Sequence, residues 1–302
     1  MNVLVVGAGV IGTVYGVQLV AGGHTVAVLG HGARTREIVR RGLVARDLAG
    51  SVSQSAETRV VSDAGGGPYD LVLVALRADC VGSSTASLRA LSGAPVLLFF
   101  GNNPRGHAAL PADLPGTVHV GFPGIGGSIG NGTAEYMRIA QQPTMLESGG
   151  GRPVDEFATT LSRAGFVVRR TTDIDGWLAY HAVFVASISA ALYRRNGNAT
   201  ELADDSATLT LMCQSIEEGF GALRREGVRG APRNLRTLHL AVLRPCAVRY
   251  WSRTMRSSAG ETLFAAHSRH AEPEMRGLAA EVVDRVGGAR ETNHLRRLLS
   301  EA

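Results

Sequence analysis

The feature that most constrains this chain is a glycine-rich turn between an apolar segment and a helical segment near the N-terminus. Residues 2–6 predict a short buried strand, and they run directly into Gly7-Ala-Gly-Val-Ile-Gly12. A helical pattern follows, two glycines end it, and residues 25–29 predict a second strand. Strand, glycine turn, helix and strand within about 30 residues is the context in which a GxGxxG motif binds a dinucleotide.

Each glycine of this turn has a separate role in such a site. Gly7 allows the tight turn, Gly9 lets the backbone approach a pyrophosphate, and Gly12 lets the helix pack closely on the sheet. The helix N-terminus then offers free N–H groups to the phosphates. The alternative is a glycine turn that holds no ligand. The predicted cofactor loop consists of Gly7, Ala8, Gly9, Val10, Ile11 and Gly12.

The end of the second strand predicts which dinucleotide binds. An NAD site usually places Asp or Glu there to bond the ribose hydroxyls, but no acid occurs before Glu37. His31, Arg34 and Arg36 instead suit the 2′-phosphate of NADP, because guanidinium groups bind phosphate well. We therefore expect NADP. The alternative is a surface loop that happens to be basic.

Further apolar segments predict more strands of a parallel sheet, over residues 69–75, 94–100 and 117–121. Ligands of such sheets lie beyond the carboxyl ends of the strands. Arg77 and Asn102 follow the first two segments, so we expect both near the cofactor. The alternative for Asn102 is a turn residue that bonds its own backbone.

After Arg170 the strand patterns stop and helical patterns begin. Ser258-Ala-Gly-Glu261 predicts a capping box. The predicted helices cover residues 174–194, 205–226, 234–256 and 258–300, the last with breaks near Pro273 and Gly287. We expect an α/β dinucleotide-binding domain with a doubly wound, mostly parallel sheet over residues 1–172. An all-α substrate and dimerisation domain should follow over residues 173–302.

All 31 basic residues are arginine, and the chain has no lysine. Any mechanism with a lysine acid, base or Schiff base is therefore excluded, and arginine stays protonated at neutral pH. Nine of the arginines and one acid fall between Arg224 and Arg256. This stretch matches no nucleic-acid-binding motif, so we expect a solvated or anion-facing surface and no nucleic-acid partner.

The cysteines and the apolar runs bound the class of protein further. Three widely spaced cysteines exclude a disulfide framework and a zinc-type cluster, so no metal site is expected. The longest apolar run, residues 178–193, is short of a membrane span and contains His181. The N-terminus shows no charged signal segment, and we expect a cytoplasmic protein without a membrane partner.

Taken together, these segments resemble the ketopantoate reductase family. The matching pieces are the loop at residues 7–12, Val72-Leu-Val-Ala-Leu-Arg77, Leu97-Leu-Phe-Phe-Gly-Asn102, and the helix that opens at Trp177 before an all-helical second domain. The resemblance implies a Rossmann domain, a helical domain, an active-site cleft between them, and NADPH-dependent reduction of a 2-oxo acid. It also implies a proton-donating lysine, and this chain has Ala179 at that position.

The rest of the site implied by the resemblance is altered as well. Val183 and Ser187 follow Ala179 on one helix face, where the family usually has asparagines. The family's acid aligns around residues 269–272, without a clear glutamate match. We therefore expect the reductase to act on a small carbonyl compound, 2-oxo acid-like and anionic, or on an imine, but not on ketopantoate itself.

Other groups must then supply the proton. Tyr180 and Ser187 lie seven residues apart and share a helix face beside the altered one, and His270 falls closest to the aligned acid. The predicted catalytic residues are Tyr180, His270, Ser187 and Asn102. Two alternatives stay open: water gives the proton, or the chain is a catalytically inactive NADPH-binding sensor or partner protein. We also expect a homodimer.

Overall fold

The computed structural model describes residues 1–30, 32–50, 52–139 and 142–300. Its larger sheet is mostly parallel, and one strand pair, β8 with β11, is antiparallel. In spatial order this sheet consists of β12 (Val168–Thr171), β11 (Thr144–Glu147), β8 (Thr117–Phe122), β7 (Val96–Phe100), β6 (Leu71–Val74), β1 (Asn2–Val6), β2 (Thr25–Leu29) and β5 (Arg59–Val61). The predicted α/β class and the five predicted strands are confirmed.

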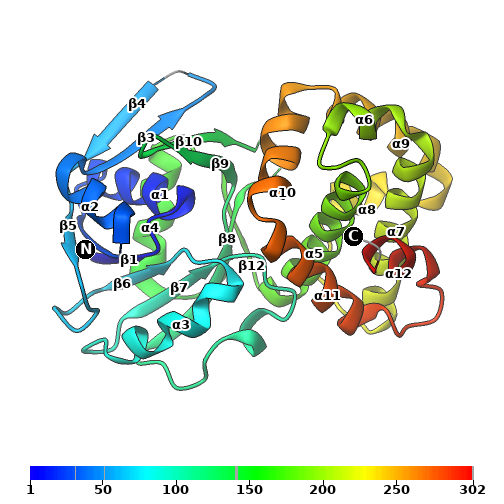
Figure 1. Ribbon diagram of the computed structural model, residues 1–302. Coiled ribbons are helices and arrows are strands. Elements are labelled where there is room, and N and C mark those ends of the chain that lie inside the picture. Colours follow the sequence, from blue (N-terminus) through cyan, green and yellow to red (C-terminus); the bar gives the residue numbers. More distant parts are fainter. Residues whose placement is uncertain (31, 51, 140–141, 301–302) are drawn as a thin grey trace. The chain divides into compact units, whose positions relative to one another are not determined.

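The central strands of this sheet are buried on both faces, which explains their unbroken apolar sequence. Val3 and Val5 of β1 belong to one hydrophobic core, while Leu4 and Val6 belong to another. Side chains alternate along a strand, so each strand feeds both cores. The first core contains residues of α1 (Val10–Ala21) and α4 (Gly151–Arg163), and the second contains Leu88 of α3 (Ala78–Arg89) (Figure 1).

A smaller sheet covers part of the first core, and the sequence analysis did not predict it. Its strands, in order, are β4 (Val52–Ala56), β3 (Leu43–Asp47), β10 (Thr133–Arg138) and β9 (Ile125–Gly130). These strands are rich in polar and small residues, with a single side facing the core. Alternation over five or six residues is a weak signal when several of the outward positions are Ser, Arg or Gly.

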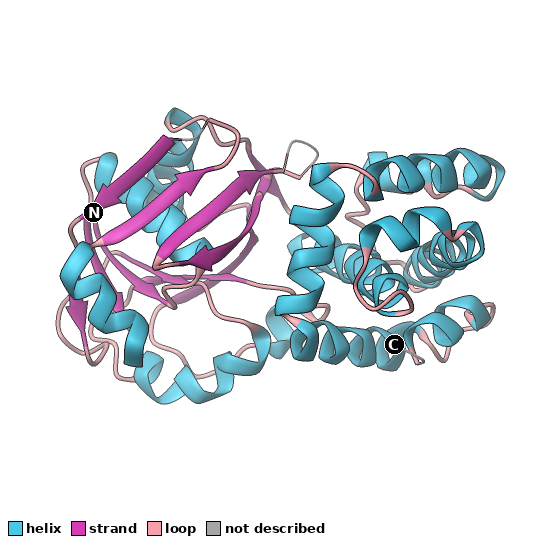
Figure 2. Cartoon of the chain, turned by 45° about the horizontal axis from the view of Figure 1, so that its top comes forward, coloured by secondary structure: helices cyan, strands magenta, loops and turns pink. Residues whose placement is uncertain are grey.

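The remainder of the chain is helical (Figure 2). Its elements are α5 (Ile174–Tyr193), α6 (Ala199–Asp204), α7 (Ser206–Arg225), α8 (Arg233–Leu238), α9 (Arg244–Met255), a π-helical turn (Gly260–Ala265), α10 (Ala266–His270), α11 (Glu272–Val286) and α12 (Asn293–Leu299). α5 is long and apolar enough to cross a membrane, but 89% of its most apolar window is buried inside this helical unit. It is therefore a core helix here.

Two predictions for this helical part are wrong. The single helix over residues 234–256 is divided into α8 and α9, because Pro245 lacks an N–H and stands in the first turn of α9. The capping box at Ser258 is also absent. Ser257 Oγ accepts the Gly260 N–H at 3.3 Å instead, and the Glu261 carboxylate pairs with Arg269. The predicted breaks near Pro273 and Gly287 are confirmed as the ends of α11.

The chain divides into two compact units. The first comprises Met1–Gly101 and Ala109–Ile174, and the second comprises Asn102–Ala108 and Asp175–Ala302. The division at residue 174 lies close to the expected boundary at 172. The short segment 102–108, which follows β7 and includes most of a 3-10 turn (Gly106–Ala109), was expected in the first domain but belongs to the second unit.

Candidate active site

The predicted cofactor loop connects β1 to α1 and has the geometry of a phosphate cradle. Gly9 is the N-cap residue of α1 and makes no side-chain capping bond. A Cβ placed on Gly9 would meet no described atom within 4 Å, so the space over the loop is open. A Cβ on Gly12 would lie 2.0 Å from the Gly7 carbonyl oxygen, which is the close contact that requires glycine there. The cap residue thus supplies no side-chain acceptor to the first-turn N–H groups of α1, which are the groups that bind phosphate in such loops.

The loop lies where the order of the strands reverses. The chain runs from β1 to β2 on one side and then crosses to β6 on the other side of β1. In doubly wound sheets this reversal marks the ligand site. The Ala75 N–H donates to the Val6 carbonyl at 2.8 Å, and a Cβ on Gly7 would lie 2.6 Å from the Ala75 carbonyl oxygen. Gly7 also has φ of +96°, so both space and backbone require glycine.

Arg77 follows β6 at this same edge of the sheet. It is the N-cap residue of α3 and is exposed, and its Nη2 lies 3.8 Å from Cys80 Sγ. The structure thus places Arg77 on the side of the sheet where the glycine loop lies, and its contact with a cofactor stays a prediction.

Arg34, on α2 (Gly32–Arg41), forms hydrogen bonds both with the glycine loop and with the turn between β9 and β10 of the smaller sheet. Its Nε donates to the Ala8 carbonyl at 3.1 Å and its Nη2 to Thr13 Oγ1 at 3.1 Å. Its Nη1 donates to the Gly132 carbonyl at 2.6 Å and to Glu37 Oε2 at 3.3 Å. These bonds occupy much of the guanidinium, so Arg34 is a positioning residue for the loop.

The other residues that bear on cofactor choice lie around Arg34. Glu37, the first acid after β2, forms ion pairs with both Arg34 and Arg41. These pairs occupy the carboxylate that could otherwise bond the ribose hydroxyls of NAD. Arg36 is exposed on α2. The predicted His31 lies outside the described residues. Arg36 is therefore an exposed positive charge near the end of β2.

Asn102 and Glu274 form a polar pair within the second unit. Asn102 follows β7 by two residues, and its Nδ2 donates to Glu274 Oε1 at 3.1 Å. Asn102 Oδ1 is buried and has no hydrogen-bond partner among the described residues. A buried amide oxygen without a partner costs about 1–3 kcal/mol, and such a group is satisfied when a ligand donates to it. Glu274 was missed in the sequence, although it lies only two residues beyond the aligned window at 269–272.

The other three predicted catalytic residues bond groups outside this pair. Tyr180 is 3% exposed, and its hydroxyl donates to the Val228 carbonyl at 3.0 Å. Ser187 is fully buried, and its hydroxyl bonds Ser215 of α7 at 2.9 Å. His270 is exposed, with its Nδ1 2.6 Å from the Ala266 carbonyl oxygen. All three side chains thus bond groups of the protein itself.

Burial of a histidine in the helical unit makes stability depend on pH. His181 is 3% exposed and stacks on Trp177 at a centroid distance of 4.9 Å, and burial lowers the pKa of His181 to about 3. The unfolded chain binds this proton below about pH 6.5, so the stabilisation is lost as the pH falls from 6.5 toward 3. Between pH 7 and pH 5, we expect His181→Phe to lose about 2 kcal/mol less of its unfolding free energy than the wild type. Urea unfolding at both pH values measures this, and equal losses would contradict it.

Comparisons with known proteins agree with this architecture. Residues 3–123 match the family profile of ketopantoate reductase PanE/ApbA. A search of curated proteins finds no match. A PanE/ApbA family ketopantoate reductase from Ralstonia eutropha JMP134 superimposes with a TM-score of 0.76 at 20% identity, covering 100% of this chain and 97% of that chain. A 2-dehydropantoate 2-reductase from Geobacter metallireducens GS-15 gives 0.76 at 16% identity, covering 99% and 98%.

A dehydrogenase also has this fold. D-mandelate dehydrogenase, in a ternary structure with NADH and anilino(oxo)acetate, superimposes with a TM-score of 0.70 at 16% identity, covering 99% of this chain and 96% of that chain. At such identities the structural likeness establishes the fold, while the sequence match covers the glycine loop and the strands up to β8. The resemblance to the ketopantoate reductase family is therefore confirmed, in sequence for residues 3–123 and in fold for the whole chain.

Proposed function

We propose that this protein is an NADPH-dependent oxidoreductase that reduces a small carbonyl compound, 2-oxo acid-like and anionic, or an imine. The open cradle at Gly9, at the N-terminus of α1, is the observation that carries the proposal. Relatives of this fold are reductases and dehydrogenases, one of them bound to NADH and an oxoacetate. A panel of 2-oxo acids, ketones and imines, assayed by the loss of NADPH absorbance, tests it.

The residues of the loop fit a dinucleotide. Gly7 to Gly12 would hold the pyrophosphate, and Arg77 would contribute charge at the same sheet edge. Bound NADPH supplies the hydride, and the chain itself must orient the substrate and handle the proton. We propose that the Asn102–Glu274 pair does this, because Asn102 Oδ1 is buried with no partner among the described residues and Glu274 brings a carboxylate.

We expect NADPH to bind at least tenfold more tightly than NADH, because one charge-assisted contact to the 2′-phosphate contributes about 1.5–3 kcal/mol. Fluorescence titration of both cofactors measures the ratio. Arg36→Gln should lower the ratio of NADPH affinity to NADH affinity. Arg40→Gln removes a charge from another exposed position of α2 and should leave it unchanged. Equal affinities for the two cofactors in the wild type would contradict the NADP assignment.

Tyr180 and His270 remain the other candidates for the proton donor. Loss of a general acid usually lowers the rate by about 10²–10⁴-fold. Once a substrate is found, we expect Tyr180→Phe or His270→Gln to lower kcat about a hundredfold only if Glu274 is not the acid. Steady-state kinetics of both variants decides this, with NADPH affinity as the control. Full kcat in both variants would leave Glu274 or water as the source.

A second function is favoured by the lysine-free sequence. The family resemblance places Ala179 where a proton-donating lysine is implied, which an inactive NADPH-binding sensor or partner protein would tolerate. If NADPH binds but no compound of the panel oxidises it, this second function is the better one. We also propose a homodimer and a cytoplasmic location; the latter fits the burial of α5 in the helical unit.

A further inference from the structure

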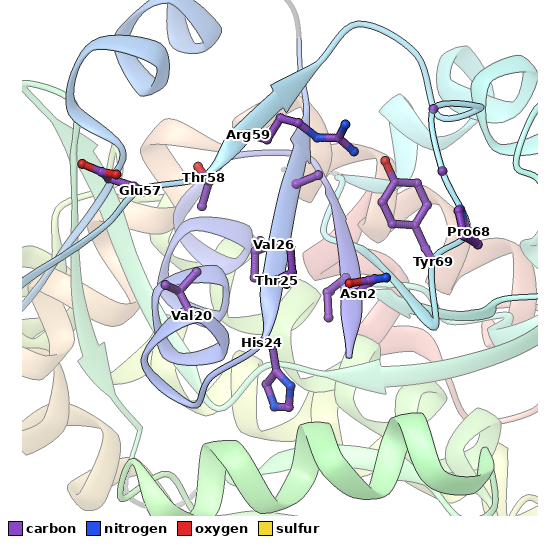
Figure 3. Close-up of a pocket in the computed structure, with 14 residues that line it drawn as sticks. Asn2, Val20, His24, Thr25, Val26, Glu57, Thr58, Arg59, Pro68 and Tyr69 are labelled. Carbon is purple, nitrogen blue, oxygen red and sulfur yellow. The ribbon is translucent and has the colours of Figure 1, made fainter.

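The first unit has a cavity at the edge of the sheet opposite the glycine loop. Its volume is about 620 Å³, and it is lined by the amino ends of β1 and β2, the start of β5 and the loop before β6 (Figure 3). Asn2 opens β1 and lies in this lining, while Gly7 lies beyond the other end of the strand. At about 3.3 Å per residue the cavity is about 16 Å from the glycine loop, so it is a separate site.

Two hydroxyl groups of the lining have no hydrogen-bond partner among the described residues. Tyr69 is 8% exposed, and its hydroxyl forms no hydrogen bond with any described residue. The same holds for Thr58 Oγ1, which is also buried. A buried hydroxyl without a partner costs about 1–3 kcal/mol, and native proteins leave few of them. A ligand that pairs with the Tyr69 hydroxyl would remove this cost for that group.

The charges around these hydroxyls point to an anion. Arg59, at the start of β5, extends its guanidinium on the side of the cavity where the Tyr69 hydroxyl points, while Glu57 lies on the far side of Thr58 (Figure 3). A guanidinium with a nearby hydroxyl donor suits a carboxylate or a phosphate. Val3 and Val26 add an apolar wall, which suits a ligand with an apolar body.

We propose that this cavity binds a small organic anion, a carboxylate or a phosphate monoester with an apolar body, through Arg59 and Tyr69. The anionic group lies against the Arg59 guanidinium and accepts a hydrogen bond from the Tyr69 hydroxyl. The site is independent of the oxidoreductase activity proposed above, because it lies at the amino ends of the strands.

Calorimetric titration of the cofactor-free protein with benzoate, phenyl phosphate and neutral benzamide tests the proposal. We expect one or both anions to bind and benzamide to bind at least tenfold more weakly. Arg59→Gln and Tyr69→Phe should each weaken anion binding at least tenfold. Benzoate against phenyl phosphate distinguishes the two head groups. The NADPH affinity of both variants should equal that of the wild type. The anion result therefore stands even if the proposed oxidoreductase function is wrong.

Arg229→Gln is the matched control, since it removes an exposed arginine of the second unit, and its anion affinity should be that of the wild type. The proposal is overturned if neither anion binds, if benzamide binds equally well, or if Arg59→Gln leaves binding unchanged. If Arg59→Gln leaves binding unchanged, the probe binds at another site, for instance the site of the substrate. If Tyr69→Phe fails to fold, the exposed Arg59 decides the question alone.

Discussion

Gly9→Val is expected to lower NADPH affinity by at least about a hundredfold while the melting temperature stays near that of the wild type. Gly9 has φ of −70° and ψ of −164°, an extended conformation that valine adopts readily. Its Cβ would enter space that no described atom fills. The side chain therefore leaves the fold intact but blocks the phosphate from the first-turn N–H groups. Losing two charge-assisted bonds of about 1.5–3 kcal/mol each accounts for the factor.

Gly12→Ala is the matched control for this experiment. It also adds a Cβ to the loop, but here we expect the stability of the fold to fall. The new carbon would lie 2.0 Å from the Gly7 carbonyl oxygen, so helix and strand must separate. Overpacking of this kind costs about 1–3 kcal/mol, and the melting temperature should fall. Thermal unfolding and fluorescence titration of both variants make the comparison. Normal NADPH binding by Gly9→Val would show that the phosphates lie elsewhere.

Glu274→Gln is expected to lower kcat about 10²–10⁴-fold, the usual effect of losing an acid or base. Glutamine keeps an oxygen that accepts the Asn102 amide, so the side-chain geometry is retained and only the charge and titration are lost. NADPH affinity should change little. Asn102→Ala should lower kcat/KM as well, because it removes both the bond to Glu274 and the buried Oδ1. Steady-state kinetics on a substrate found in the panel measures both effects.

Glu272→Gln is the control for this second experiment. Glu272 lies on the same helix two residues earlier, and its carboxylate pairs with Arg276, with Oε1 2.9 Å from Nε. Its neutralisation should leave kcat near the wild-type value, since exposed ion pairs of this kind contribute little. If Glu274→Gln keeps full kcat, Glu274 does not transfer the proton. The Asn102–Glu274 pair then only orients the substrate, and Tyr180, His270 or water supplies the proton.

Local patterns in the sequence predicted the cofactor loop and the central strands. The order of strand, glycine turn and helix depends on short-range backbone geometry, and Gly7 and Gly12 occupy positions where any side chain would collide. Buried parallel strands such as β1 and β6 are continuous apolar runs, which a sequence shows directly. Pro273 and Gly287 likewise delimit α11 through their own backbone chemistry.

Contacts between distant residues were decided only by the tertiary structure. Arg34 looked like a phosphate ligand, but the fold brings Gly132 and Thr13 to its guanidinium. Glu274 lies 172 residues from Asn102, and no periodicity or motif links the two. The cavity at Tyr69 likewise forms from four separate stretches of chain. A sequence specifies each residue's own conformational preferences, whereas hydrogen-bond partners, burial and open space arise from which segments the folded core brings together.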